Sequence, residues 1–143
     1  MPYFLVPFIG WLISGIIKFL INLARYGQGA KERIGNGGFP STHTTTLVTT
    51  TVYIAVKNGW NTPVVGVAVG LTFIVILDAL GLRQAVGEHA RALNNLLTID
   101  DGVGKRYRES MGHKLTEILG GIVLGTIIGF ALNFFSLIGR VSI

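Results

Sequence analysis

Three stretches of the chain are long, apolar and almost free of charge: residues 3–24, 63–82 and 115–138. Each contains a single charged side chain. Each also has about the 20 apolar residues that an α-helix needs to cross the hydrocarbon core of a bilayer. The pattern therefore predicts three membrane-spanning helices.

Between the first two stretches, residues 43–57 form a shorter apolar run that is rich in Thr and other β-branched residues. In isolation this composition also suits a β-strand. Between spanning helices, it is better interpreted as a fourth span, a helix whose hydroxyls bond back to its own carbonyls. Residues 84–98 predict a short amphipathic helix at the membrane interface, with Asn94 facing water. Residues 99–112 predict a mobile loop.

The composition favours a membrane protein. The chain has 143 residues, of which 50% are hydrophobic and 13% charged, whereas a soluble domain has about 25% charged residues. The absence of Cys excludes a disulfide scaffold, an iron–sulfur centre and a thiol nucleophile. We therefore predict an all-α integral membrane protein with one transmembrane domain over residues 1–143. Its fold would be a helical bundle of about four spans plus one interfacial helix.

The basic residues are concentrated in alternate loops. The loops after the first and third spans carry Arg25, Lys31, Arg33, Arg83, Arg91, Lys105, Arg106, Arg108 and Lys114, whereas the second loop has only Lys57 and the C-terminal tail only Arg140. The positive-inside rule then places both basic loops in the cytoplasm and both termini outside. A nucleic-acid-binding patch would not alternate in register with apolar spans. We therefore interpret the net charge of +5 as topology plus an anion site, with no nucleic acid as partner.

Glycine spacing indicates close helix packing. Gly121, Gly125 and Gly129 repeat every four residues in the last span, and Gly66 and Gly70 do so once. Small residues at this spacing let helix backbones approach closely. The triple repeat predicts a packing face, either within the chain or between the subunits of a homo-oligomer. The single pair is equally well explained by the general frequency of Gly in membrane helices.

Polar side chains gather at the cytoplasmic end of every predicted span. They are Lys18, Arg25, Ser41, Thr42, His43, Asp78, Arg83, His113 and Glu117. Taken singly, they have structural explanations: a Lys near a helix end snorkels to the interface, and a Ser or Thr caps a helix. Asp78 and Arg83 can also pair with each other. Because ionisable groups at membrane depth are costly, their convergence at one face indicates a functional site.

The cations of this face suit a phosphate. Lys18, Arg25 and Arg83 supply positive charge, and Arg binds phosphate in bidentate fashion. Residues 37–42 lead into a helix, and the free backbone N–H groups at such a start bind anions. The sequence thus predicts a site for a phosphate group.

Two histidines add chemistry to that site. His43 and His113 can supply a general acid and a nucleophile, and Glu117 can hold His113 in the tautomer that leaves one ring nitrogen free to attack. This set indicates phosphoryl transfer through a phosphohistidine intermediate, with water completing the cycle.

These residues resemble three motifs of the type 2 phosphatidic acid phosphatases, which are related to bacterial acid phosphatases and vanadium haloperoxidases. Lys18 and Arg25 resemble the K-x6-R-P motif without its Pro, and residues 40–43 resemble P-S-G-H with Thr in place of Gly. His113 and Glu117 resemble H-x3-D with Glu in place of Asp.

The chain is more similar to a small divergent membrane branch, the acid phosphatase/vanadium-dependent haloperoxidase-related proteins. That branch has the segments G-G-M-P-S-S-H, D-A-x-G-V-R-x3-G-x-Q-A and G-H-x3-E. This chain has, in the same order, Gly-Gly-Phe-Pro-Ser-Thr-His at 37–43, Asp-Ala-Leu-Gly-Leu-Arg at 78–83, Gly-Glu-His-Ala at 87–90, and Gly-His at 112–113 followed by Glu117. The resemblance covers almost the whole chain.

The resemblance implies a role for each residue. His113 attacks phosphorus, Glu117 orients it and His43 protonates the leaving group. The remaining residues, assigned to substrate binding, are Lys18, Arg25, Ser41, Thr42, Asp78 and Arg83. The implied mechanism needs no metal and no other cofactor.

The chain departs from the family at the third motif. The family's Arg should stand six residues before His113, where this chain has Tyr107. Arg106 and Arg108 flank that position, and Arg83 is a third candidate for the same function. His89 follows Arg83 at the family's spacing but lacks an acid four residues later, so it is a minor candidate for the nucleophile.

The function predicted first is that of a membrane lipid phosphatase at the cytoplasmic face. Its substrate would be a lipid phosphate or diphosphate monoester, such as phosphatidylglycerophosphate, phosphatidic acid or a polyprenyl (di)phosphate. One alternative is a non-catalytic protein that binds or transports a lipid phosphate. Another is a metal-dependent membrane phosphatase that uses Asp78, Glu88, His89 and Asp100 or Asp101.

Overall fold

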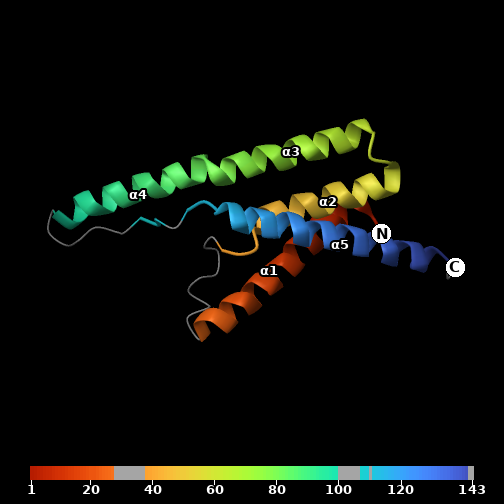
Figure 1. Ribbon diagram of the computed structural model, residues 1–143, viewed down its shortest axis with the longest axis horizontal. Helices are drawn as coiled ribbons and strands as arrows, with labels where there is room; N and C mark the ends of the chain where they lie inside the picture. Colours follow the sequence, from red (N-terminus) through yellow and green to blue (C-terminus); the bar gives the residue numbers. More distant parts are fainter. Residues whose placement is uncertain (28–37, 100–106, 110, 142–143) are drawn as a thin grey trace.

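The computed structural model describes residues 1–27, 38–99, 107–109 and 111–141, and these contain helices but no β-strand (Figure 1). The helices are α1 (Val6–Tyr26), preceded by a 3₁₀ turn η1 (Tyr3–Leu5), α2 (Thr42–Asn58), α3 (Pro63–Leu80), α4 (Leu82–Ile99) and α5 (Leu115–Val141). The predicted fold class, a helical membrane bundle, is confirmed.

Helix α2 lies at the centre of the bundle. It packs against α5, α1 and α3, and α3 lies on one side of it while α1 and α5 lie on the other (Figure 1). The chain reverses direction between α1 and α2, between α2 and α3, and between α4 and α5, so the two termini lie at the same end of the molecule (Figure 1). The candidate polar residues belong to the opposite end.

Among the described residues, three helical stretches are long and apolar enough to cross a membrane: Tyr3–Tyr26, Pro63–Leu96 and Leu115–Ile138. Their outward side chains are large and apolar, for example Phe8, Trp11 and Phe73, which are 64%, 60% and 60% exposed. Such a surface suits lipid and would be costly in water. The chain is therefore a membrane protein.

Helix α2 differs because it is rich in hydroxyls and packed between the other helices. The hydroxyls of Thr45, Thr46, Thr50 and Thr51 each donate to the carbonyl four residues earlier, at 2.8 to 2.9 Å. This is the back-bonding that the sequence predicts. These four hydroxyls therefore need no partner outside α2, which lets the helix lie among apolar helices.

The glycine repeat of α5 is used within the chain. A Cβ atom on Gly121, Gly125 or Gly129 would lie 2.7 to 2.9 Å from the nearest atoms of α2, among them the carbonyl oxygens of Ser41 and Thr45. The two backbones are thus as close as glycine permits. The sequence leaves open whether these glycines pack within the chain or between subunits, and the structure shows packing within the chain. A homo-oligomer through the same glycines would need a face that α2 already covers.

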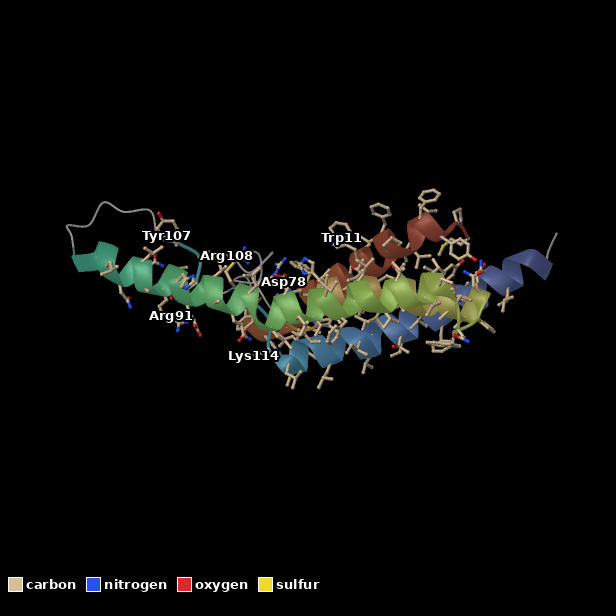
Figure 2. All side chains as sticks on the ribbon, turned by 90° about the horizontal axis from the view of Figure 1, so that it is seen from above. Trp11, Asp78, Arg91, Tyr107, Arg108 and Lys114 are labelled. Atoms are coloured by element: carbon tan, nitrogen blue, oxygen red, sulfur yellow. The ribbon has the colours of Figure 1, made fainter. Side chains whose placement is uncertain are left out.

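Helices α3 and α4 follow each other in line through Gly81, and α4 extends beyond the rest of the bundle (Figures 1 and 2). Part of the loop predicted over 99–112 lies outside the described residues, namely 100–106 and 110. The described part is bound to α4. The amide of Asn94 pairs with the backbone N–H and carbonyl of Tyr107, at 2.7 and 2.8 Å, and donates to Glu109.

This contact corrects the prediction for Asn94. The sequence places its side chain in water, whereas the residue is only 7% exposed because the returning segment covers it. An Asn on an amphipathic helix is ordinarily solvated. Here its amide matches a backbone N–H and carbonyl that would otherwise need other partners.

The close α2–α5 contact generates the first prediction. Gly125→Ala should lower the free energy of unfolding by about 1–3 kcal/mol, because the new methyl group would overlap α2. Gly66→Ala is the matched control, since a Cβ there meets nothing within 4 Å. The control should be neutral or stabilising by up to about 1 kcal/mol. Thermal unfolding in detergent, followed by circular dichroism, measures both, and equal melting temperatures for the two variants would contradict the packing described.

Candidate functional site

The centre of the site is a buried pair formed by His113 and Glu117 at the start of α5. Nδ1 of His113 lies 2.8 Å from Oε2 of Glu117, and the two side chains are 7% and 16% exposed. A carboxylate accepts hydrogen bonds but does not donate them, so this contact keeps the proton on Nδ1. In the neutral ring, Nε2 then keeps its lone pair, as a nucleophile requires.

The backbone of His113 is fixed by the junction of α3 and α4. Its N–H donates to the carbonyl of Ala79 at 3.1 Å, and its carbonyl accepts from Nε2 of Gln84 at 3.0 Å. The preceding Gly112 has a φ of 89° and lies so close to Gln84 that a side chain would not fit. Sequence reasoning missed Gln84, because nothing in its local pattern points to a contact 29 residues away.

The start of α2 is fastened to the same pair. The N–H of Ser41 donates to the carbonyl of Glu117 at 2.9 Å. The ring of His43, on the first turn of α2, is edge-on to the ring of His113, with centroids 6.3 Å apart. His43 is exposed whereas His113 is buried. One histidine is therefore held in place, and its neighbour is open to solvent or substrate.

Lys18 reaches the site from α1. Its side chain lies against Gly38, where a Cβ would be 3.3 Å from Cε and 3.9 Å from Nζ of Lys18. Its charge interacts with those of Glu117 and Arg108. Gly38 has a φ of 133°, so it can present its backbone to the lysine without a side chain between them. Lys18 is therefore placed beside the histidine pair.

Arg83 and Asp78 form an ion pair. Nε of Arg83 lies 2.7 Å from Oδ2 of Asp78, and the side chains are 42% and 33% exposed. The pairing that the sequence left open is thus present. The contact is made by Nε of the guanidinium, so Asp78 fixes the orientation of the group. Both charges act electrostatically on His43, which places the pair at the site.

Ser41 caps α2. Its hydroxyl oxygen accepts from the N–H of Thr44 at 3.4 Å and from the hydroxyl of Thr44 at 3.0 Å, and the residue is fully buried. The adjacent Thr42 opens the helix and is half-buried. The first N–H groups of α2 and of α5 lie at this end of the bundle, where the positive ends of two helix dipoles favour an anion.

Arg25 lies farther out than the other candidate residues. It is exposed on the last turn of α1, about 10 Å along the helix from Lys18, where α1 has diverged from the bundle (Figure 1). Within the described residues its guanidinium has no ion pair or hydrogen bond. Of the two arginines that flank Tyr107, Arg106 lies outside the described residues. Arg108 interacts electrostatically with Lys18.

The residues of the metal-dependent alternative are not assembled in the described part of the chain. Glu88 and His89 are exposed on α4, and Asp100 and Asp101 lie outside the described residues. No group of three His, Asp or Glu side chains within the described ranges has the arrangement of a metal site. Asp78, Glu109 and Glu117 instead pair with Arg83, Arg91 and His113, respectively.

Comparison with known proteins identifies the family of the chain. The model of the divergent PAP2 family matches residues 1–128. The uncharacterized membrane protein YuiD of Bacillus subtilis (strain 168) is 24% identical over an alignment of 114 residues, which covers 69% of this chain and 72% of that protein. No solved structure matches the chain significantly. The resemblance to a divergent branch of the type 2 phosphatidic acid phosphatases is confirmed, and the chain belongs to the divergent PAP2 family.

Proposed function

We propose that this membrane protein is a lipid phosphatase that hydrolyses a lipid phosphate or diphosphate monoester through a phosphohistidine. The observation that carries the proposal is the buried contact between Nδ1 of His113 and Glu117, at 2.8 Å, beside the exposed ring of His43. A site that only bound phosphate would gain most from a doubly protonated, cationic His113. A carboxylate held on one ring nitrogen suits a nucleophile.

The first chemical step transfers the phosphoryl group to the protein. Nε2 of His113 attacks phosphorus while the bond from phosphorus to the lipid oxygen breaks. His43, in its protonated form, gives its proton to that leaving oxygen. Lys18, Arg83 and the helix N-terminus that begins at Thr42 stabilise the charge that spreads over the equatorial oxygens.

Water completes the cycle. The now neutral His43 takes a proton from a water molecule as the oxygen of that water attacks phosphorus. The bond from phosphorus to Nε2 breaks, inorganic phosphate leaves, and both histidines return to their starting states. Glu117 keeps Nδ1 protonated throughout, and Asp78 keeps Arg83 in register with the phosphate. Arg25 belongs to an outer position, where it would attract the anionic substrate.

The substrate class follows from the location of the site. It lies at the end of a bundle with a lipid-facing surface, where the head group of a lipid can reach the cations. The distribution of basic residues favours the cytoplasmic face. Phosphatidylglycerophosphate, phosphatidic acid and a polyprenyl (di)phosphate all have the required phosphate on a hydrocarbon anchor.

Removal of the nucleophile tests the proposal directly. His113→Gln should lower phosphate release from phosphatidic acid by about a thousandfold or more, because no other side chain replaces Nε2. His89→Gln is the matched control, since His89 is exposed on α4, and it should retain the wild-type rate. Release is measured with purified protein in vesicles, across the candidate lipids.

The same assay separates the alternatives. Undiminished turnover by His113→Gln would refute the assignment of His113 as the nucleophile. Loss of turnover on addition of a chelator would favour the metal-dependent mechanism. Binding of the lipid by the wild type without any phosphate release would favour the non-catalytic binding protein.

The ion pair at Arg83 generates a separate prediction. Asp78→Ala should reduce kcat/KM for the lipid phosphate by about 10- to 100-fold, because Arg83 loses the partner that orients it. Glu88→Ala removes an exposed carboxylate from α4 and should have little effect. Steady-state kinetics of the two variants measure the difference, and equal values would show that Asp78 does not position Arg83.

A further inference from the structure

Three sides of α2 are covered by identifiable contacts. Thr49 lies against α1, where a Cβ on Gly10 would be 3.1 Å from its side chain. The hydroxyl of Thr51 lies 3.3 Å from that of Thr72 on α3. Since residues two apart are about 200° apart around a helix, α1 and α3 pack on nearly opposite sides of α2. The glycine face of α5 covers a third side, at Val48 and Val52.

The fourth side of α2 lies between α1 and α3. It is marked by His43, Thr46, Thr50 and Ile54, which recur at intervals of three and four residues and so share one helix face. Thr46, Leu47, Thr50 and Ile54 are all half-buried. We call Thr46, Leu47, Thr50 and Ile54 the recessed face of α2, which ends at His43 toward the site and at Lys57 toward the other end of α2.

This face is more sheltered than the lipid-facing surface of the outer helices. Val67 on α3 and Val123 on α5 are 63% and 61% exposed, whereas the side chains of the recessed face are half-buried and thus less accessible. The difference arises because α1 and α3 flank α2 on either side. A molecule that lies along the recessed face would therefore be in contact with three helices.

The recessed face is apolar in effect although half of its residues are Thr. The hydroxyl of Thr46 donates to the carbonyl of Thr42 at 2.8 Å, and that of Thr50 to the carbonyl of Thr46 at 2.9 Å. With their donors used inside α2, these residues offer mainly methyl groups. A hydrocarbon chain can cover such a surface without leaving a hydroxyl donor unsatisfied.

The ends of the face are chemically different from its middle. One end is His43, beside the candidate phosphate site. The other is Lys57, whose Nζ lies 4.8 Å from the ring centroid of Tyr53 and 5.4 Å from that of Tyr3. The rise from His43 to Lys57 is about 21 Å, which is most of the roughly 30 Å hydrocarbon core. An apolar strip thus runs through the membrane from the phosphate site to a cation held on aromatic rings.

We propose that the recessed face of α2 seats one hydrocarbon chain of the phosphorylated lipid whose head group occupies the site at His43 and His113. The proposal rests on the function proposed above and names the part of the substrate that lies inside the bilayer. The chain is the occupant that fits, because the face is continuous with the phosphate site at one end and is apolar along its length. Bulk phospholipids carry their phosphate as a diester beneath a further head group, so they lack the terminal phosphate monoester that would hold a chain in register there.

The test uses purified protein in vesicles and two readouts. The first is phosphate release from long-chain phosphatidic acid compared with glycerol 3-phosphate, which has the phosphate but no chain. The second is photocrosslinking by phosphatidic acid with a diazirine in the middle of one chain, compared with diacylglycerol that has the same chain, and mapped by mass spectrometry.

Thr50→Trp should fill the recessed face. We expect kcat/KM for phosphatidic acid to fall about tenfold or more, with the rate for glycerol 3-phosphate unchanged within about twofold. Crosslinks from phosphatidic acid to residues 46–54 should exceed those from diacylglycerol and should disappear in this variant. Thr50→Val, which keeps the shape, and Ile127→Trp, on the outward face of α5 at 59% exposed, should behave as wild type.

The outcomes separate the chain seat from the phosphatase. Equal crosslinking by the two lipids, or equal kinetics for Thr50→Trp and Ile127→Trp, would overturn the chain seat and leave the phosphatase standing. Loss of the glycerol 3-phosphate rate in Thr50→Trp would also overturn it, since the substitution would then act on the site itself. Selective crosslinks that Thr50→Trp abolishes, in a wild type that releases no phosphate, would support the seat and refute the phosphatase.

Discussion

The close packing of α2 against α5 is the contact on which the rest of the molecule depends. Gly121, Gly125 and Gly129 bring the two backbones so near that a single methyl group would collide with α2. At the site end, this approach lets the N–H of Ser41 reach the carbonyl of Glu117 at 2.9 Å. The starts of α2 and α5, and with them the two histidines, are thus held together by a contact that runs the length of the bundle.

The helices could be predicted from the sequence because their signals are local. Apolar runs long enough to span a membrane predicted α1, α3 and α5. Residues 42–58 form a helix, with back-bonded Thr hydroxyls, although their composition also suits a strand. The polar ends were predicted to meet because successive helices reverse direction. His113, Glu117, His43 and Lys18 do meet at one end, since the first three lie within about a turn of the start of α5 or α2 and Lys18 lies just over two turns before the end of α1.

The sequence could not predict the contacts between segments that are far apart in the chain and share no recognisable pattern. The amides of Asn94 and Gln84 bind backbone groups of the returning segment and of His113, and neither position stands out in an amphipathic helix. The glycine repeat indicated close packing but not its partner, because spacing describes a face and not what covers it. Arg25 matched a motif by spacing alone, whereas its distance from the other cations depends on the direction in which α1 diverges.

The alternation of helix directions explains why this end of the bundle suits a phosphate. The helices α2 and α5 present their N-termini there, and α1 and α3 present their C-termini. Two positive dipole ends and two negative ones would largely cancel. The side chains break that balance: Arg25 ends α1 and Arg83 follows α3, so cations offset both negative ends. At the positive ends, Glu117 stays an anion in the first turn of α5, where the helix dipole stabilises it, while His43 adds no negative charge. Asp78 offsets Arg83, but near these helix ends the cations Lys18, Arg25 and Arg83 still outnumber the carboxylates Asp78 and Glu117. The positive balance of these described groups therefore comes from a few local side chains rather than from the overall charge of the chain.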